Sequence, residues 1–335
     1  MIEARGLSKR YGDKWAVYNL SFDVRPGAVT GFLGPNGAGK STTMRLILGL
    51  DEPTAGTVTV GGHPFRRLPN APRQVGALLD AKAVHGGRTA RAHLKCLAQL
   101  SGIPDRRVDE VLDVVGLLGV AFQRSKGFSL GMSQRLGIAA ALLGDPQVLL
   151  FDEPVNGLDP EGIRWVRELM KRLAAEGRTV FVSSHLMSEM SLTADHLIVI
   201  GRGQLIADTS VKDFIERSAS GYALVRTPDE DQTATLTTAL TEAGGSVEAL
   251  PDGALKVTGV PLPGISDLAH EADVRLWELS PHSGSLEEAY MALTQPAVDF
   301  RSTTDRRAGL LQELPPPPAP VLPQSSEVLE SEAAR

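Results

Sequence analysis

The chain has 335 residues, of which 42% are apolar, so its length suggests about two domains and its composition excludes a wholly disordered protein. Its 34 Lys and Arg residues stand against 40 Asp and Glu residues, and the resulting formal net charge of −6 does not favour a nucleic-acid-binding protein. The one cysteine, Cys96, excludes an intrachain disulfide and a cysteine-rich metal site.

Membrane-spanning and export signals are missing from the sequence pattern. No stretch of about 18 consecutive apolar residues occurs, as a transmembrane helix requires. Residues 1–5 do not lead into the apolar segment of a signal peptide. We therefore expect a soluble, intracellular chain that meets a membrane only through a partner.

A phosphate-binding motif follows the first strand signals. Apolar runs at Val17–Val24 and Val29–Leu33 predict strands, and a helical pattern from about 39 to 48 comes next. Between strand and helix the sequence matches G-x-x-x-x-G-K-[ST], whose glycines let backbone N–H groups face nucleotide phosphates. We expect the Lys40 ammonium to reach the β- and γ-phosphates and the Ser41 hydroxyl to bind Mg²⁺. The motif and its next residue are Gly34, Pro35, Asn36, Gly37, Ala38, Gly39, Lys40, Ser41 and Thr42.

The stretch 84–128 has helical patterns and no strand signal. One helix is predicted over Ala90–Leu100. A second is predicted from the apolar residues Val108, Val111, Leu112 and Val115. We interpret this stretch as a helical insertion in an α/β core.

An apolar strand at Val148–Phe151 ends in two consecutive carboxylates, Asp152 and Glu153. Beside the phosphate motif, Asp152 would hold Mg²⁺ directly or through water, and Glu153 would act as general base on the attacking water. The alternative is an acidic strand end that faces solvent. The matching phosphate motif disfavours that alternative.

A helix with clear boundaries comes after the carboxylates. Asp159 is its expected N-cap, Pro160 its first residue and Gly177 the residue past its end. Buried strands are predicted next at Thr179–Val182 and His196–Ile200. Strands that alternate with helices predict an α/β core with a mostly parallel sheet.

Residues 220–280 form a second unit. The element order βαββαβ predicts a small α+β domain of the ferredoxin-like type. A helix is predicted at Leu286–Leu293, and the proline-rich, acidic end from about Pro315 is expected to be disordered. The predicted elements of the second unit are strands at Tyr222–Arg226, Ser246–Leu250, Ala254–Thr258 and Val274–Leu279, a helix at Thr233–Ala243 and a short helix around Leu268.

Six motifs in order make residues 1–210 resemble the nucleotide-binding subunits of ABC transporters. Two are the phosphate motif and the carboxylate strand. Residues 128–135 (FSLGMSQR) resemble the family signature, L-S-G-G-Q followed by x-Q-R. Residues 156–159 resemble the D-loop, and residues 183–185 (SSH) resemble the segment of the switch histidine. Tyr11 stands where the family stacks an aromatic ring on adenine.

The resemblance implies a P-loop ATPase that uses ATP and Mg²⁺ as a homodimer with two shared sites. His185 would donate a hydrogen bond to the γ-phosphate or to the attacking water, beside the catalytic Glu153 and Lys40. Asp159 would link the two sites across the subunit interface and cap its helix as well. The signature residues would cap the γ-phosphate held by the other subunit with a helix N-terminus, and they are Ser129, Leu130, Gly131 and Met132.

The motifs depart from the family pattern at three positions. In the signature, Leu130 replaces a glycine and Met132 replaces a glutamine, while the phosphate-facing Ser129 and Gly131 are present, so we expect catalysis to be retained. Asp80 stands where the family usually has the glutamine of the Q-loop, and we expect altered coupling to the transport subunit there. A solvated loop acid is the plain alternative for Asp80.

The pattern at 285–294, the signature and the Asp80 loop resemble ATPases of the multidrug and antibiotic-resistance exporter branch, which includes daunorubicin- and bacitracin-type exporters. This implies a peripheral subunit on the cytoplasmic side of the cell membrane. It would power the export of a drug, antibiotic or lipid-like molecule through a separate transmembrane permease. Two alternatives stay open: a non-transport ABC ATPase acting on ribosomes or DNA, and a polysaccharide exporter ATPase.

The expected domains follow from these assignments. An ATP-binding domain spans 1–215 and includes the helical signature subdomain at 84–128. An accessory domain spans 220–295, and a mostly disordered tail spans 296–335. The accessory domain has three candidate roles: regulation, stabilisation of the dimer and binding of the permease.

Overall fold

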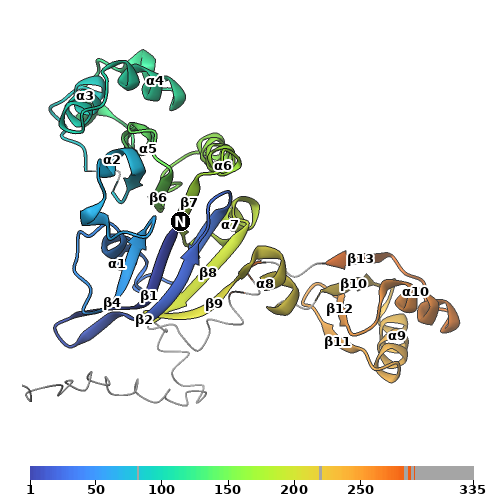
Figure 1. The fold of residues 1–335 in the computed structure, drawn as a ribbon. Coiled ribbons are helices and arrows are strands. Elements are labelled where there is room, and N and C mark those ends of the chain that lie inside the picture. Colours follow the sequence, from blue (N-terminus) through green and yellow to red (C-terminus); the bar gives the residue numbers. More distant parts are fainter. Residues whose placement is uncertain (81–82, 219–220, 283–285, 288–289, 291–335) are drawn as a thin grey trace, which may run out of the picture. The chain divides into compact units, whose positions relative to one another are not determined.

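The computed structural model describes residues 1–80, 83–218, 221–282, 286–287 and 290 (Figure 1). Residues 1–218 form an α/β domain with two sheets, called here the N-terminal domain. Residues 221–282 form a smaller unit with a sheet of its own, called here the accessory domain. Within the described ranges, no helix has the length and apolar character needed to cross a membrane.

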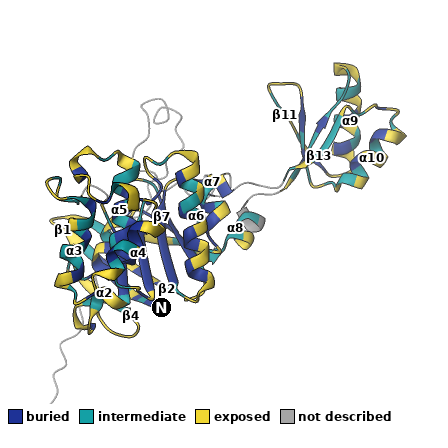
Figure 2. Cartoon of the chain, turned by 90° about the horizontal axis from the view of Figure 1, so that it is seen from above, coloured by how far each residue is buried: buried dark blue, intermediate teal, exposed yellow. Residues whose placement is uncertain are grey.

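The central sheet of the N-terminal domain has the strand order β5-β6-β7-β3-β8-β9 and is parallel except for its last pair. Nearly all residues of β3, β6, β7 and β8 are buried (Figure 2), because layers on both faces cover the sheet. The apolar runs that predicted these four strands are thereby confirmed. The strands are β3 (Val29–Leu33), β5 (Val75–Leu78), β6 (Val148–Asp152), β7 (Thr179–Ser184), β8 (His196–Gly201) and β9 (Gln204–Ser210).

A second, antiparallel sheet with the order β2-β1-β4 covers one face of the central sheet. Its strands are β1 (Ile2–Tyr11), β2 (Lys14–Val24) and β4 (Ala55–Val60). Helix α1 (Lys40–Ile47) packs into the same core. Phe22, Phe32 and Phe181 meet there with ring centroids 5.0–5.9 Å apart, so aromatic contacts join the two sheets.

Helices cover the opposite face of the central sheet. The core on that side includes the buried faces of α5 (Leu130–Leu142), α6 (Pro160–Ala175) and α7 (Met187–Thr193), together with Phe214 of α8 (Val211–Ser218). Between β4 and β5, a short helical turn η1 (Phe65–Arg67) and helix α2 (Ala71–Gln74) connect the two sheets.

The stretch 84–128 is helical, as its sequence predicts. It contains α3 (Ala90–Leu100), α4 (Arg106–Val114) and the short turns η2 (Leu118–Val120) and η3 (Ser125–Gly127). Figure 1 shows α3 and α4 together beside α5. Their apolar residues join the helical core of the N-terminal domain, so this insertion packs on the domain and has no separate core.

The accessory domain is a four-stranded antiparallel sheet with the order β11-β12-β10-β13. This arrangement confirms the predicted α+β unit with the element order βαββαβ. Apolar side chains of both helices and of the sheet form one core, which is distinct from those of the N-terminal domain. The elements are β10 (Tyr222–Arg226), α9 (Glu230–Glu242), β11 (Ser246–Ala249), β12 (Leu255–Thr258), α10 (Leu262–Glu271) and β13 (Glu278–His282).

One predicted strand differs from the structure, and a predicted helix lies mostly outside the described residues. The last strand begins at Glu278, not at Val274, because the N–H group of Val274 donates to the Ala269 carbonyl and closes the end of α10. Of the helix predicted at 286–293 only residues 286, 287 and 290 are described, and Leu286 and Tyr290 are buried members of the N-terminal domain's helical core. The tail predicted at 296–335 lies outside the described residues.

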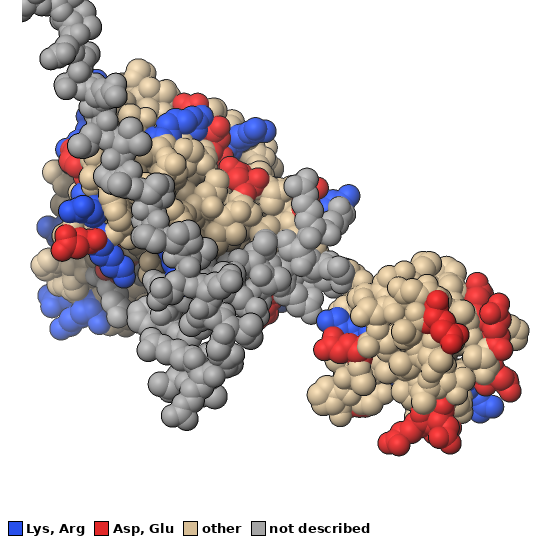
Figure 3. Space-filling view, turned by 90° about the horizontal axis from the view of Figure 1, so that it is seen from below, with Lys and Arg blue, Asp and Glu red and all other residues tan. Residues whose placement is uncertain are grey.

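Charge is distributed unevenly along the chain. The segment 221–282 carries ten acidic residues and three basic ones. Figure 3 accordingly shows more red than blue on the accessory domain. A surface of this sign repels the phosphate backbone of nucleic acids.

Candidate active site

The phosphate motif forms the loop between β3 and α1. Gly37 and Gly39 have φ angles of 83° and 106°, in the left-handed region that other residues rarely adopt. At Gly39 there is also no room for a side chain, since a Cβ atom would lie 2.4 Å from the carbonyl oxygen of Ala16. The glycines therefore let the loop turn directly into α1, whose first N–H groups are suited to bind phosphate.

Lys40 is buried at the start of α1, with only 7% of the residue exposed. Its Nζ donates to the Gly34 carbonyl at 2.7 Å and lies 3.9 Å from Glu153 Oε1. Burial lowers the pKa of the Lys40 ammonium, and the negative charges of Glu153 and Asp152 oppose that shift. The Lys40 ammonium thus lies close to Asp152 and Glu153, the two carboxylates predicted to belong to the same site.

The two carboxylates follow each other at the end of β6 but are held differently. Asp152 accepts a hydrogen bond from Ser183 Oγ on the neighbouring strand β7. The N–H group of Glu153 donates to the same Ser183 oxygen at 3.0 Å. Glu153 has φ of 50°, so its backbone is left-handed where a residue with a Cβ atom is strained.

Glu153 brings several parts of the domain together. His185 Nδ1 lies 2.7 Å from Glu153 Oε2, and the amide Nε2 of Gln134 in α5 donates to the Glu153 carbonyl at 3.0 Å. Lys40, Glu153 and His185, all predicted as catalytic, are therefore in one contact group. The contact of Gln134 was not anticipated, because nothing in the signature motif shows which way that side chain points.

A pocket of about 360 Å³ lies over the phosphate loop. Ser41 and Asp152 both line this pocket, and hard oxygen donors of this kind suit Mg²⁺. Lys14 and Ala16, which belong to no recognised motif, also line the pocket. Its lining residues are Tyr11, Lys14, Ala16, Pro35, Asn36, Gly37, Gly39, Lys40, Ser41, Thr42, Asp152 and Glu153.

Gly34 and Ala38, which were also predicted to bind ATP, shape the loop from behind. A Cβ atom on Gly34 would lie 2.6 Å from the Ile200 carbonyl oxygen, so only glycine lets the loop pass β8. Ala38 is buried and accepts a hydrogen bond at its carbonyl from the Gly203 N–H group. These two residues therefore support the loop, and neither is among the residues lining the pocket.

Tyr11 lies at the end of β1 beside the pocket, with 48% of its surface exposed. Its hydroxyl donates to Asp51 Oδ2 at 2.8 Å, and Arg45 of α1 binds both oxygens of that carboxylate at 2.7 and 3.2 Å. The hydrogen bonds from Arg45 and then from Tyr11 lower the pKa of Asp51 to about 2. This network anchors the Tyr11 ring to the helix that begins at the phosphate loop.

The signature residues begin α5 and do not line the pocket of their own chain. Ser129 is the N-cap, because its side chain accepts from the Met132 N–H group at 3.1 Å. The helix therefore starts at Leu130. Leu130 packs on Gly157, where a Cβ atom would lie 2.1 Å from a Leu130 methyl carbon.

Asp159 and Asp80 lie at other edges of the domain. Asp159 caps α6 by accepting from the Gly162 N–H group at 2.8 Å, which confirms its predicted cap. Asp80 is exposed after β5, next to residues 81–82, which lie outside the described part of the chain. Neither residue is among those lining the nucleotide-sized pocket, so their interface and coupling roles stay predictions.

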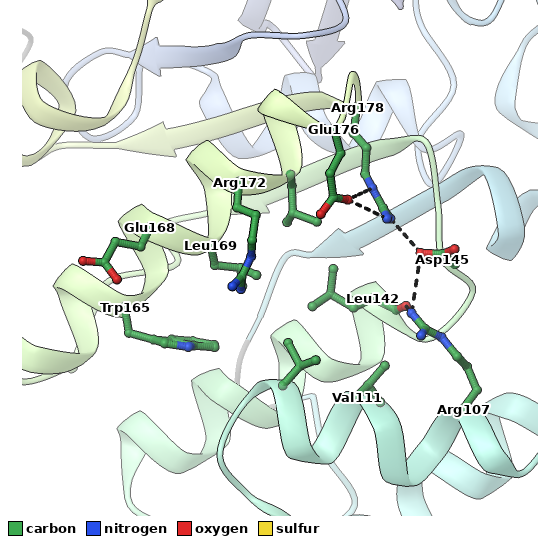
Figure 4. A pocket seen from close by; sticks show the side chains of 12 residues that line it. Arg107, Val111, Leu142, Asp145, Trp165, Glu168, Leu169, Arg172, Glu176 and Arg178 are labelled. Carbon is green, nitrogen blue, oxygen red and sulfur yellow. Dashed lines mark hydrogen bonds and ion pairs between the residues drawn. The ribbon is translucent and has the colours of Figure 1, made fainter.

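A second pocket, of about 400 Å³, separates α4 from α6 (Figure 4). One wall is a chain of ion pairs that runs from Arg107 through Asp145 and Arg178 to Glu176. The opposite wall carries the Trp165 side chain. No predicted site residue lines this pocket, whereas Lys40, Asp152 and Glu153 line the pocket over the phosphate loop, which is therefore the candidate active site.

Two family models match parts of the chain. Residues 17–156 match the family described as ABC transporter, and residues 221–287 match one described as a domain of unknown function, DUF8746. Among curated relatives, the uncharacterized ABC transporter ATP-binding protein YhcH of Bacillus subtilis is 35% identical over 88% of this chain and 96% of its own. The bacitracin transport ATP-binding protein BcrA of Bacillus licheniformis is 38% identical over 70% of this chain and 78% of its own.

Solved structures agree on the fold. An ATP-binding subunit of an ABC transporter is 28% identical and superimposes with a TM-score of 0.60 over 65% of this chain and 92% of its own. A bacterial ABC transporter cassette solved as a dimer, 24% identical, has a TM-score of 0.58 over 63% of this chain and 99% of its own. Together with the geometry of the site, these matches show that the chain belongs to the ATP-binding subunits of ABC transporters and is an ATPase.

Proposed function

We propose that two copies of this chain hydrolyse Mg·ATP at shared sites and power an exporter whose permease is a separate polypeptide. The observation that carries the catalytic part is the contact of Lys40, Glu153 and His185 beside one pocket. A cation, a base and a hydrogen-bonding group at that spacing are what phosphoryl transfer to water needs.

The charged and polar residues at the site would have different roles in the reaction. Lys40 would exchange the Gly34 carbonyl for phosphate oxygens. Mg²⁺ held by Ser41 and Asp152 would neutralise the phosphate charge. Glu153 would take a proton from the attacking water while that water's oxygen bonds to the γ-phosphorus and the bond from phosphorus to the ADP oxygen breaks. His185 would orient the Glu153 carboxylate or donate to the γ-phosphate.

Dimerisation is supported by the position of the signature segment. Ser129, Leu130, Gly131 and Met132 begin a thirteen-residue helix but do not line the pocket of their own chain. The N-terminus of such a helix suits a phosphate group. We assign that phosphate to the ATP of the second copy, with Asp159 at the interface between the two sites.

Export is supported by the similarity to BcrA, whose name assigns it to bacitracin transport. We place the chain on the cytoplasmic side of the cell membrane as a peripheral subunit. Its cargo would be a drug, an antibiotic or a lipid-like molecule. Binding and hydrolysis of ATP would close and open the dimer, because the nucleotide contacts the two forms differently.

The alternative functions fit the accessory domain less well. Its ten acidic residues against three basic ones oppose binding to DNA or to ribosomal RNA. A sugar-binding role would need exposed aromatic rings. Trp277 is 69% exposed, but the Tyr222 ring stacks on His282 at a centroid distance of 5.1 Å and is covered on that face.

The test is to purify the tagged full chain from membranes and to identify what accompanies it. We expect a polytopic membrane protein in about equal amount. Ribosomal or DNA-processing proteins in its place would overturn the exporter assignment. For the catalytic part, Glu153→Gln should lower turnover roughly 10²- to 10⁴-fold while ATP still binds, and wild-type turnover would remove Glu153 from the role of base.

A further inference from the structure

The backbone of Glu153 needs support that its own sequence does not supply. Its φ of 50° lies in the left-handed region, where a Cβ atom clashes with the chain. A residue stays in that region only when its surroundings hold it there. The residue concerned is also the proposed general base, so the direction of its carboxylate depends on this local conformation.

Two buried side chains hold the peptide groups on either side of the Glu153 Cα atom. On the N–H side, Ser183 Oγ accepts at 3.0 Å. On the carbonyl side, Gln134 Nε2 donates at 3.0 Å. Gln134 is only 3% exposed and Ser183 is fully buried, so water does not compete readily for either contact.

The two contacts differ in what else they do. Ser183 also donates to Asp152, so its removal would disturb the proposed metal ligand together with the base. The one hydrogen bond found for the Gln134 side chain is the one to the Glu153 carbonyl, within the described part of the chain. Gln134 is therefore the residue at which the support of Glu153 can be tested separately.

We propose that Gln134 is a positioning residue that holds Glu153 in its left-handed conformation and so aims the carboxylate at the attacking water. The proposal rests on the function proposed above, in which Glu153 is the base. Gln134 lies in the helix that begins with the signature residues, so it also ties that helix directly to the catalytic strand. Without its amide, the Glu153 carbonyl keeps only the longer hydrogen bond from the Asn156 N–H group, at 3.2 Å, and the backbone relaxes more easily toward negative φ.

The experiment measures ATP turnover and ADP affinity in the full chain with Gln134→Met, which keeps the length of the side chain and removes its donor. We expect kcat to fall about tenfold, as the loss of one buried hydrogen bond predicts, while the Kd for ADP stays within about twofold. Gln134→Leu should behave alike, because it also removes the donor to the carbonyl. It serves as the second variant if Gln134→Met does not fold.

A matched control is Gln74→Met. Gln74 Nε2 also donates to a backbone carbonyl, that of Pro69, but in α2 away from the pocket. This variant should leave turnover unchanged. A general loss of stability would lower the melting temperature and the ADP affinity of the Gln134 variants, whereas a positioning role lowers kcat alone.

The decisive readout is the double variant with Glu153→Gln in single-turnover assays. If Gln134 acts through Glu153, adding Gln134→Met to Glu153→Gln should lower the rate by less than about twofold, because no base is left to position. If Gln134→Met lowers the rate tenfold both in the wild type and in Glu153→Gln, Gln134 does not act through Glu153. That result, or an unchanged kcat in the Gln134 variants, would overturn the positioning role and leave the proposed function intact. Wild-type turnover in Glu153→Gln would instead overturn the proposed function.

Discussion

Replacing Asp51 should weaken nucleotide binding without slowing the chemical step. The carboxylate joins the Tyr11 hydroxyl, at 2.8 Å, to Arg45 near the end of the helix that starts at the phosphate loop. It thereby fixes the ring that we expect to stack on adenine. In Asp51→Ala the ring can turn away, so the nucleotide itself has to order the ring when it binds.

The size of the effect follows from exposure. A hydrogen bond to a charged group contributes about 1.5–3 kcal/mol to stability. Because Tyr11 is 48% exposed, water replaces part of that contact, and we expect about 1 kcal/mol, or about fivefold in Kd. Tyr11→Phe, which loses only the hydroxyl, should match Asp51→Ala. Tyr11→Ala loses the stacking as well and should weaken binding by about 1–3 kcal/mol, roughly 5- to 150-fold.

The assay is calorimetric titration with ADP, combined with kcat and KM for ATP. Asp13→Ala removes an exposed acid nearby and serves as the control. The pKa of Asp51 is about 2, below its ordinary 3.8, so its contribution is complete above about pH 4 and is lost as the pH falls toward 2. Burial and Asp51 raise the pKa of the Tyr11 phenol, which stays a donor at neutral pH.

Two results would refute this reasoning. Wild-type ADP affinity in Tyr11→Ala would show that the ring does not stack on the base. A larger loss in Asp51→Ala than in Tyr11→Ala would show that Asp51 acts on something other than the ring.

Three further predictions concern the loop, the coupling site and the core. Lys40→Ala should weaken ATP binding roughly 10- to 100-fold in an equilibrium titration, because phosphate loses a charge-assisted donor, and wild-type affinity would contradict the phosphate-loop assignment. Asp80→Asn should keep basal hydrolysis nearly intact but be stimulated less by the co-purified permease, and equal stimulation would reject the coupling role. Phe181→Ala should cost about 3–5 kcal/mol in urea unfolding, because its fully buried ring contacts Phe22 and Phe32, while Phe122→Ala, 80% exposed, should stay within about 0.5 kcal/mol. Similar losses in both variants would contradict this view of the core.

The local sequence predicted four of the six strands of the central sheet, β3, β6, β7 and β8, because these four are buried on both faces. Runs such as Val29–Leu33 are apolar at almost every position and end at glycine or at acids. Strands β1 and β4 of the antiparallel sheet were missed, and so were β5 and β9 at the two edges of the central sheet. β1 mixes Glu3, Arg5 and Lys9 with apolar residues, and its pairing shifts register along its length. Pairing with distant strands, and not a local signal, makes it a strand.

The site divides in the same way. Loop residues such as Lys40 and strand-end acids such as Asp152 follow from short motifs, since chemistry and local geometry coincide there. The contacts that support these residues cannot be predicted from short motifs. Asp51 lies forty residues from Tyr11, and Gln134 lies nineteen from Glu153, so only the folded chain shows that they meet.

The accessory domain is joined to the rest of the chain at both of its ends. Its first and last strands are neighbours, with Tyr222 opposite His282, so it starts and finishes at one place. Phe214 before it and Leu286 and Tyr290 after it belong to the same core of the N-terminal domain. We therefore expect that residues 221–282 can be replaced or deleted while the N-terminal domain keeps its packing, since loop-closure entropy changes only slowly with loop length. The same N-terminal domain could thus carry different accessory domains at this position.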